Sequence, residues 1–134
     1  MTLQADSLEQ LAEQVAKHAY APYSTFSVGA AIKTAAGNIY SGCNVENVSS
    51  GLTVCAERNA VGAAIAAEGT AMKVVEVFVT NKNAAGETIH CSPCGACRQV
   101  LAEFSAPDTK VTYRGVEKNI ETTMGDLLPD GFTF

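Results

Sequence analysis

Hydrophobic and polar positions follow two different periods in the first third of the chain. Apolar residues recur at helical spacing between residues 7 and 19, which predicts an amphipathic helix opened by a capping box of Ser7 and Gln10. Residues 26–33 alternate between two faces, as in a β-strand. Gly37 predicts a turn, and residues 39–43 are then expected to form the returning strand of a hairpin.

Longer apolar stretches dominate the rest of the chain. Residues 54–68 are dense in alanine and predict a helix that is buried nearly all round and ends at Gly69. Residues 74–80 are almost continuously apolar, which is typical of a central strand. Pro93 favours the start of a helix over residues 94–104, and two short strands (110–114 and 117–122) and a helical turn (123–128) follow. This order predicts a three-layer α/β/α sandwich with a mixed central sheet, formed by residues 1–134 as one domain.

Composition and charge narrow the classes of function. The longest run of small apolar residues, 60–67, is too short to span a membrane, and no secretory leader precedes the first helix, so we expect a cytoplasmic protein. The net charge is −5 and the basic residues are scattered, which disfavours a polymeric nucleic acid but allows a small neutral nucleoside. The five cysteines are an odd number, so metal binding explains them better than a disulfide framework.

Three of the cysteines lie where helices are predicted to begin. Cys94 and Cys97 share one side of a first helical turn, and Cys55 precedes the alanine-rich helix. A helix N-terminus stabilises thiolate, and three thiolates leave a zinc ion with one open coordination position, as in catalytic zinc sites. One alternative is a redox dithiol of Cys94 and Cys97, which leaves Cys55 and Glu57 unexplained. The other is a closed structural zinc site, with Cys43, His90 or Cys91 as the fourth ligand.

Glu57 lies two residues after Cys55 and offers a carboxylate beside the expected metal. Such a carboxylate can accept a proton from an acidified water and pass it on. The ordinary interpretation of an acidic residue in a first helical turn is a favourable interaction with the helix dipole, and only the neighbouring cysteine favours the catalytic one. Arg58 and Arg98 could likewise form solvent-facing pairs or balance the charge of the thiolates.

These residues belong to a pattern that resembles a known family. Cys55-Ala56-Glu57-Arg58, followed by Pro93-Cys94-Gly95-Ala96-Cys97-Arg98-Gln99, is similar to the signature of the small zinc-dependent cytidine deaminases of pyrimidine salvage. The likeness extends over nearly the whole chain, since residues 21–30, 42–53 and 126–132 also match segments of that family.

The resemblance implies hydrolytic deamination of cytidine and 2′-deoxycytidine to uridine and 2′-deoxyuridine, with release of ammonia. It implies one zinc ion held by three cysteines, attack at C4 of the cytosine ring, and a glutamate that moves protons to N3 and to the 4-amino group. It also implies a homotetramer with sites shared across subunits. Carried over to this chain, the implied roles are zinc ligation by Cys55, Cys94 and Cys97; proton transfer by Glu57; balance of the thiolate charge by Arg58; contact with the ribose by Asn44 and Glu46; contact with the base by Phe26 and the backbone of Ala56; and contact with a neighbouring subunit's site by Phe132.

The chain departs from the family pattern at two neighbouring positions. Ser50 stands where an aromatic residue is usual, and Val48 stands where alanine is usual. The change at Ser50 bears on pocket size and substrate choice and leaves the metal chemistry untouched. The alternative that this change raises is a deaminase of another or N4-substituted cytosine nucleoside. A separate alternative is a non-catalytic module stabilised by structural zinc.

Overall fold

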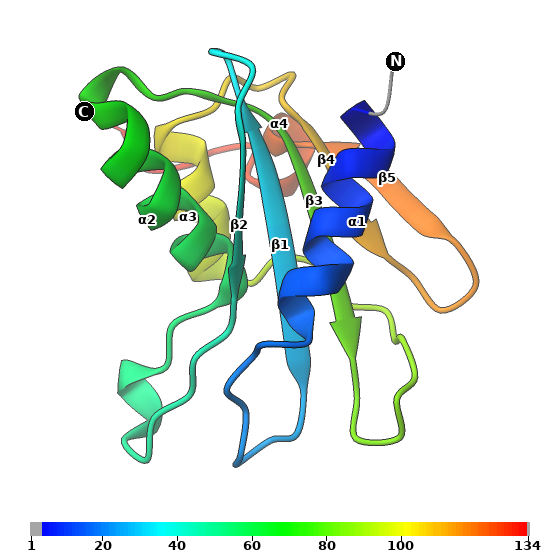
Figure 1. Ribbon diagram of the computed structural model, residues 1–134. Coiled ribbons are helices and arrows are strands. Elements are labelled where there is room, and N and C mark those ends of the chain that lie inside the picture. Colours follow the sequence, from blue (N-terminus) through cyan, green and yellow to red (C-terminus); the bar gives the residue numbers. More distant parts are fainter. Residues whose placement is uncertain (1–3, 134) are drawn as a thin grey trace.

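A five-stranded sheet in the order β2-β1-β3-β4-β5 forms the centre of the computed structural model, which describes residues 4–133 (Figure 1). The helices and strands follow the predicted order. They are α1 (Gln4–Ala16), β1 (Ser27–Thr34), β2 (Ile39–Cys43), η1 (Ser50–Leu52), α2 (Ala56–Glu68), η2 (Gly69–Ala71), β3 (Val74–Lys82), α3 (Gly95–Glu103), β4 (Lys110–Arg114), β5 (Asn119–Thr123) and α4 (Met124–Leu127).

The sheet is mixed, as the sequence predicts. β1 pairs antiparallel with both β2 and β3, β3 pairs parallel with β4, and β4 pairs antiparallel with β5. β3 is the central strand, and five of its nine residues are buried in one run from Val77 to Asn81. Among the strands of residues 4–133, only β3 and β4 pair in parallel, and such a pair needs a crossover connection, which α3 supplies on one face of the sheet.

Helices cover both faces of the sheet, which gives three layers (Figure 1). One face packs against α1 in a small core of Leu8, Ala12, Ala31 and Phe78. The other face packs against α2, α3 and α4 in a larger core. Alternate residues of β1 enter the two cores, since Ala30 and Ile32 belong to the larger one and Ala31 to the smaller.

α1 differs from its prediction at both ends. It begins at Gln4, so Ser7 lies within the helix and the predicted capping box is wrong. It ends at Ala16 and not near residue 19, because the next amides bond three residues back, in a tighter turn. The backbone of Tyr20 then pairs with residues 44–46, a long-range contact that the local pattern does not encode.

α2 is not buried nearly all round. It packs its inner side, which includes Ala60 and Ala64, on the sheet, while the small residues of its outer side are exposed: Gly62, Ala63, Ala66 and Ala67. The helix covers one face of the sheet and nothing in the described chain lies over its other side. Its end is as predicted, since Gly69 adopts a positive φ of 80°.

Within residues 4–133, no helix has the length and apolar character that crossing a membrane requires.

Candidate metal centre and active site

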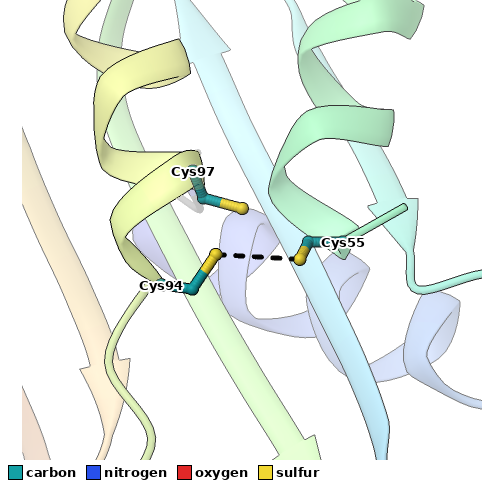
Figure 2. A group of neighbouring side chains, drawn as sticks. All are labelled: Cys55, Cys94 and Cys97. Atoms are coloured by element: carbon teal, nitrogen blue, oxygen red, sulfur yellow. Dashed lines mark hydrogen bonds between the residues drawn. The ribbon is translucent and has the colours of Figure 1, made fainter. Parts of the chain in front are cut away.

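Two helix starts meet on the α2/α3 side of the sheet, and each carries cysteine. Cys55 is the N-cap of α2, and Cys94 is the N-cap of α3. Both have the extended backbone of an N-cap, with ψ of 158° and 166°. Cys97 is the third residue of α3, so its sulfur returns to the side of Cys94. Figure 2 shows the three sulfurs pointing toward one another from the two helices.

The spacing of the sulfurs fits a metal ion with sulfur ligands. The three Sγ atoms lie within 4.8 Å of one another, and those of Cys55 and Cys94 are 3.8 Å apart. A tetrahedral zinc ion with zinc–sulfur distances of about 2.3 Å has sulfur–sulfur edges of about 3.8 Å. Cys97 is fully buried and Cys94 is exposed, so the group extends from the core to the surface. Cys43, His90 and Cys91 lie outside this group.

The pKa values of Cys55 and Cys97 show what a bound cation would change. Hydrogen bonding to Cys97 and to Arg58 lowers the pKa of Cys55 to about 5, against the opposing effect of burial. The pKa of Cys97 is raised, because its thiol donates to Cys55 and is buried near Glu57. Burial and the nearby negative groups raise the pKa of Cys91 as well. A dication between the three sulfurs would supply the positive charge that deprotonation of Cys97 requires.

Glu57 is the second residue of α2 and only 4% exposed. Burial is the main cause that raises its pKa to about 7, and the charge of Cys55 adds to it. Its own backbone N–H, Cys97 and Arg58 oppose the shift. A carboxyl group with a pKa near 7 can both accept and donate protons close to neutral pH.

The two arginines beside the cysteines differ in what they contact. Arg58 Nη2 donates to Cys55 Sγ at 3.8 Å and to the Thr53 carbonyl at 3.2 Å. The side chain of Arg98 instead donates to oxygen atoms of Ser92, Pro93 and Leu127. The arginine hydrogen bond to the sulfurs in this structure therefore comes from Arg58.

Asn44 directly follows β2 and holds the start of β1. Its side-chain Nδ2 donates to the Phe26 carbonyl at 2.8 Å, and its Oδ1 accepts from the Val28 N–H at 2.9 Å. Asn44 is buried and Phe26 is half-buried. One N–H and one lone pair of the amide remain for a ligand.

Glu46 organises the loop that precedes β1. Its Oε1 accepts the N–H groups of Tyr23 and Ser24 at 3.0 and 3.2 Å, and its Oε2 accepts the Ser24 hydroxyl. The Ser24 hydroxyl and these backbone donors lower the pKa of Glu46. The carboxylate therefore stays charged, and Oε2 keeps one lone pair for a further donor.

The other predicted site residues lie in different surroundings. Ala56 is fully buried as the first residue of α2, between Cys55 and Glu57. Ser50 lies in η1 and is exposed. Phe132 is 70% exposed, and its backbone exchanges hydrogen bonds with the Gln99 side chain. It lines a groove of about 620 Å³ beside α3, and none of the three cysteines lines that groove.

Sequence reasoning missed Asn81 altogether, and considered Arg98 only as a partner of the thiolates or of solvent-facing acids. Both residues hold the cysteine-bearing segment. Asn81, at 1% exposure, brackets the backbone of Ile89, and Arg98 holds the residues just before Cys94. A polar residue next to the end of an apolar strand could have indicated the role of Asn81. The role of Arg98 had no local signal, because one of its acceptors is the carbonyl of Leu127, 29 residues away.

Known proteins share both the sequence pattern and the fold. The family model of the cytidine and deoxycytidylate deaminase zinc-binding region matches residues 3–113. A cytidine deaminase of Halalkalibacterium halodurans is 42% identical over 121 residues, which are 90% of this chain and 87% of that protein.

Solved structures agree with this match. The cytidine deaminase of Burkholderia pseudomallei has a TM-score of 0.82 at 40% identity and covers 98% of this chain and 100% of its own. That of Mycobacterium tuberculosis has a TM-score of 0.80 at 38% identity, with coverage of 97% and 98%. The matched region includes both cysteine-bearing helix starts and the buried glutamate between them. The chain therefore belongs to the cytidine and deoxycytidylate deaminase family and is a zinc-binding enzyme.

Proposed function

We propose that this chain catalyses the hydrolytic deamination of cytidine and 2′-deoxycytidine to uridine and 2′-deoxyuridine, with release of ammonia. The observation that carries the proposal is the position of Glu57, a buried carboxyl group two residues from one of three converging thiols. A structural zinc site has no need of an ionisable group that titrates near neutral pH beside the metal.

Cys55, Cys94 and Cys97 are the proposed ligands of one zinc ion. Zinc in this position would supply Lewis acidity and so generate a nucleophile from water near neutral pH. Three thiolates carry more negative charge than the ion offsets. Arg58, which donates to Cys55 Sγ, would reduce that excess and keep the metal acidic.

Glu57 is the proposed proton carrier. It takes one proton from the attacking water and delivers it to N3 of the ring while the oxygen bonds to C4. It then moves the second proton of that water to the 4-amino group, so that the C4–N bond breaks and ammonia leaves. Both protons of the water are thus accounted for, one on N3 of uridine and one on ammonia. A pKa near 7 suits a group that must take up and release protons in each turnover.

The remaining proposed roles are contacts with the substrate. Asn44 and Glu46 would bind the ribose hydroxyls with the donor and acceptor capacity that their internal hydrogen bonds leave over. Phe26 would lie against the pyrimidine ring, and the backbone of Ala56 would contact the base. Phe132 would reach the site of a neighbouring subunit.

That last contact requires an assembly, and a homotetramer is the proposed state. Its support is the exposed apolar outer side of α2 and the 70% exposure of Phe132. Sedimentation equilibrium of the purified protein would give the mass of the assembly. The proposed setting is pyrimidine salvage in the cytoplasm, because a reducing compartment keeps the five free cysteines available.

The activity is tested by following cytidine absorbance as uridine forms, with zinc content measured on the same samples. Wild-type protein should bind one zinc ion per chain and convert cytidine and deoxycytidine. Glu57→Gln removes the carboxylate at nearly equal volume, so we expect a loss of at least about 100-fold in kcat with zinc still bound. Wild-type protein that holds zinc and leaves both nucleosides unchanged would contradict the proposal. Free cytosine and N4-substituted cytidines in the same assay test the alternative of a deaminase for another cytosine compound.

A further inference from the structure

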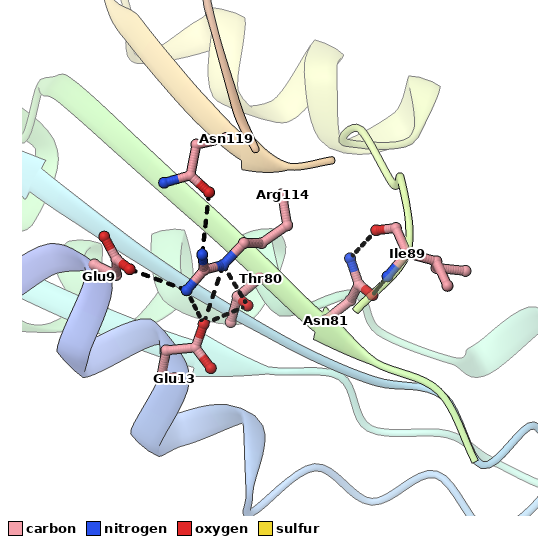
Figure 3. A network of polar contacts seen from close by, with 7 residues as sticks. All are labelled: Glu9, Glu13, Thr80, Asn81, Ile89, Arg114 and Asn119. Atoms are coloured by element: carbon pink, nitrogen blue, oxygen red, sulfur yellow. Dashed lines mark hydrogen bonds and ion pairs between the residues drawn. The ribbon is translucent and has the colours of Figure 1, made fainter. Parts of the chain in front are cut away.

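The segment that leads to Cys94 has no regular secondary structure and depends on contacts with three other elements. Residues 88–93 belong to no helix or strand. Asn81, in β3, brackets Ile89 with two hydrogen bonds of 2.7 and 2.9 Å. Figure 3 shows the Asn81 amide facing the backbone of Ile89. The N–H of Cys91 donates to the carbonyl of Arg114 in β4 at 3.3 Å. The last residues before Cys94 are held by α3 itself, through Arg98.

The guanidinium group of Arg98 makes three hydrogen bonds. Nε donates to the Pro93 carbonyl at 2.7 Å, and Nη2 donates to the Ser92 hydroxyl at 3.0 Å. Nη1 donates at 3.0 Å to the carbonyl of Leu127, the last residue of α4. The planar fork therefore ties the segment before the cysteine to the C-terminal part of the chain.

The contact with Pro93 bears directly on the position of a thiol. The Pro93 carbonyl belongs to the peptide bond that Cys94 shares with its predecessor, and this peptide is planar. Fixing the direction of that carbonyl fixes the rotation of the peptide plane, and with it the N–Cα bond of Cys94. The φ of −67° about this bond then sets the Cα–Cβ direction. Cys94 makes no side-chain cap hydrogen bond of its own in α3. Apart from its contact with the Cys55 sulfur at 3.8 Å, the direction of the Cys94 sulfur depends on the backbone around it.

We infer that Arg98 is a positioning residue for the metal centre, which orients Cys94 through the Pro93–Cys94 peptide. This role differs from that of Arg58, which contacts a sulfur directly. The inference rests on the ligands assigned under the proposed function. Arg98 would thus affect the geometry of the metal site without touching a sulfur, since its side chain donates to two backbone carbonyls and a hydroxyl.

The test measures metal geometry and metal release separately from activity. Arg98→Gln should shift the absorption bands of Co²⁺ bound in place of zinc, because these bands follow the arrangement of the sulfur ligands. It should also speed the loss of zinc to a chelator by about 10- to 100-fold, the usual range for residues that orient metal ligands. Arg98→Lys keeps the charge but loses the three-way fork, so it should shift both measurements in the same direction.

Arg114→Gln is the matched control. Arg114 also makes several side-chain hydrogen bonds, to Glu9, Glu13, Thr80 and Asn119, but its side chain lies on the α1 side of the sheet (Figure 3). Its carbonyl, which accepts from Cys91, survives the substitution. Arg114→Gln should lower the free energy of unfolding and leave the cobalt spectrum and zinc release at their wild-type values.

The possible results separate the inference from the proposed function. Wild-type cobalt bands and zinc release in both Arg98 variants would overturn the inference while the ligand assignment stands. If Arg98→Gln does not fold, Ser92→Ala, which deletes one acceptor, should give a smaller shift of the same sign, and no shift would count against the inference. Failure of the wild-type protein to bind either metal would instead refute the ligand assignment of the proposed function.

Discussion

Three side-chain amides bind the backbone of distant segments as a neighbouring strand would. Asn44 does so for Phe26 and Val28, Asn81 for Ile89, and Gln99 for Phe132. In each case the amide nitrogen donates to a carbonyl and the amide oxygen accepts a backbone N–H. A side-chain amide carries the same donor and acceptor as a peptide, so it can continue a ladder where no strand is available.

Asn44 gives the residue-scale prediction. Asn44→Ala leaves the Val28 N–H and the Phe26 carbonyl without this partner in a part-buried position. An unsatisfied buried polar group costs roughly 1–3 kcal/mol, so we expect the free energy of unfolding in urea to fall by about 2 kcal/mol. Asn47→Ala is the control, because Asn47 is exposed and its Oδ1 accepts only from nearby Ser49. Equal stability of the two variants would show that Asn44 does not hold the start of β1.

Single residues differ in how far their roles can be predicted from the sequence. The nearness of Cys94 to Cys97 follows from their spacing at one helix start. The meeting of that helix start with the one at Cys55 is set by how α2 and α3 pack on the sheet. The place of Glu57 in the first turn of α2 follows from its position two residues after Cys55, and the structure adds that its side chain is buried. The internal hydrogen bonds of Asn44 and Glu46 could not be predicted, since their partners are set by how the loop before β1 folds back on the end of β2.

At the scale of elements, the site depends on how closely α2 lies against β2. A Cβ atom on Gly42 would lie 2.6 Å from the Ala56 carbonyl oxygen, 2.8 Å from the Asn59 carbonyl carbon, and in contact with the Ala60 nitrogen. The close approach occurs at the first turns of α2, which also carry Cys55 and Glu57. Only glycine lets the helix start come this near to the sheet.

Gly42→Ala should therefore disturb both stability and metal binding. The added methyl group meets helix backbone and not a flexible side chain, so α2 must shift, at a cost of about 1–3 kcal/mol. We expect a lower free energy of unfolding in urea and faster loss of zinc to a chelator. In Gly51→Ala, where a Cβ has nothing within 4 Å, both quantities should stay at wild-type values. Wild-type zinc release from Gly42→Ala would mean that the close approach does not position the ligands.

Element boundaries were predictable where local patterning decides them. The bounds of β2 and β4 match residues 39–43 and 110–114, because alternation and a glycine turn define them. The bounds of α1 were predicted wrongly, because its end depends on the pairing of Tyr20 with residues 44–46. The exposure of the outer side of α2 was missed for a similar reason: composition cannot tell how many sides of a helix the rest of the chain covers.

At the scale of the whole molecule, one polar network joins parts of the chain that are up to 105 residues apart. Arg114, in β4, pairs with Glu9 and Glu13 of α1, and Thr80 of β3 also donates to Glu13 at 2.7 Å (Figure 3). The guanidinium carbon lies 5.6 Å from the centre of the Phe78 ring. The network thus fixes α1 to the sheet on the face opposite the cysteines.

This network makes the stability of the fold depend on pH. Burial alone would raise the pKa of Glu13, but hydrogen bonds from Thr80 and Arg114 and the charge of Arg114 outweigh it and hold the pKa below its usual value of 4.5. A carboxyl group whose pKa is lower in the folded state stabilises the fold above its unfolded pKa. That stabilisation is lost as the pH falls through the folded pKa. The pH range in which the fold loses the stabilisation from Glu13 therefore lies below about pH 4.5.

Glu13→Gln isolates this contribution. At pH 7 we expect the free energy of unfolding of the variant to be about 1 kcal/mol lower than that of the wild type. The value is modest because the Glu13 side chain is 31% exposed and solvent screens its ion pair with Arg114. The difference from the wild type should shrink in urea titrations repeated between pH 5 and about pH 3, because the wild-type carboxylate is then protonated. Taking the difference between the two proteins cancels the titration of groups they share, including the thiols.

Glu121→Gln is the control. Glu121 forms an ion pair of 3.9 Å with Lys110, and its side chain is 68% exposed, so the free energy of unfolding of this variant should match that of the wild type at every pH. A Glu13→Gln difference that stayed constant with pH would mean that the lost interaction is packing or a neutral hydrogen bond, and not the charge that Arg114 binds.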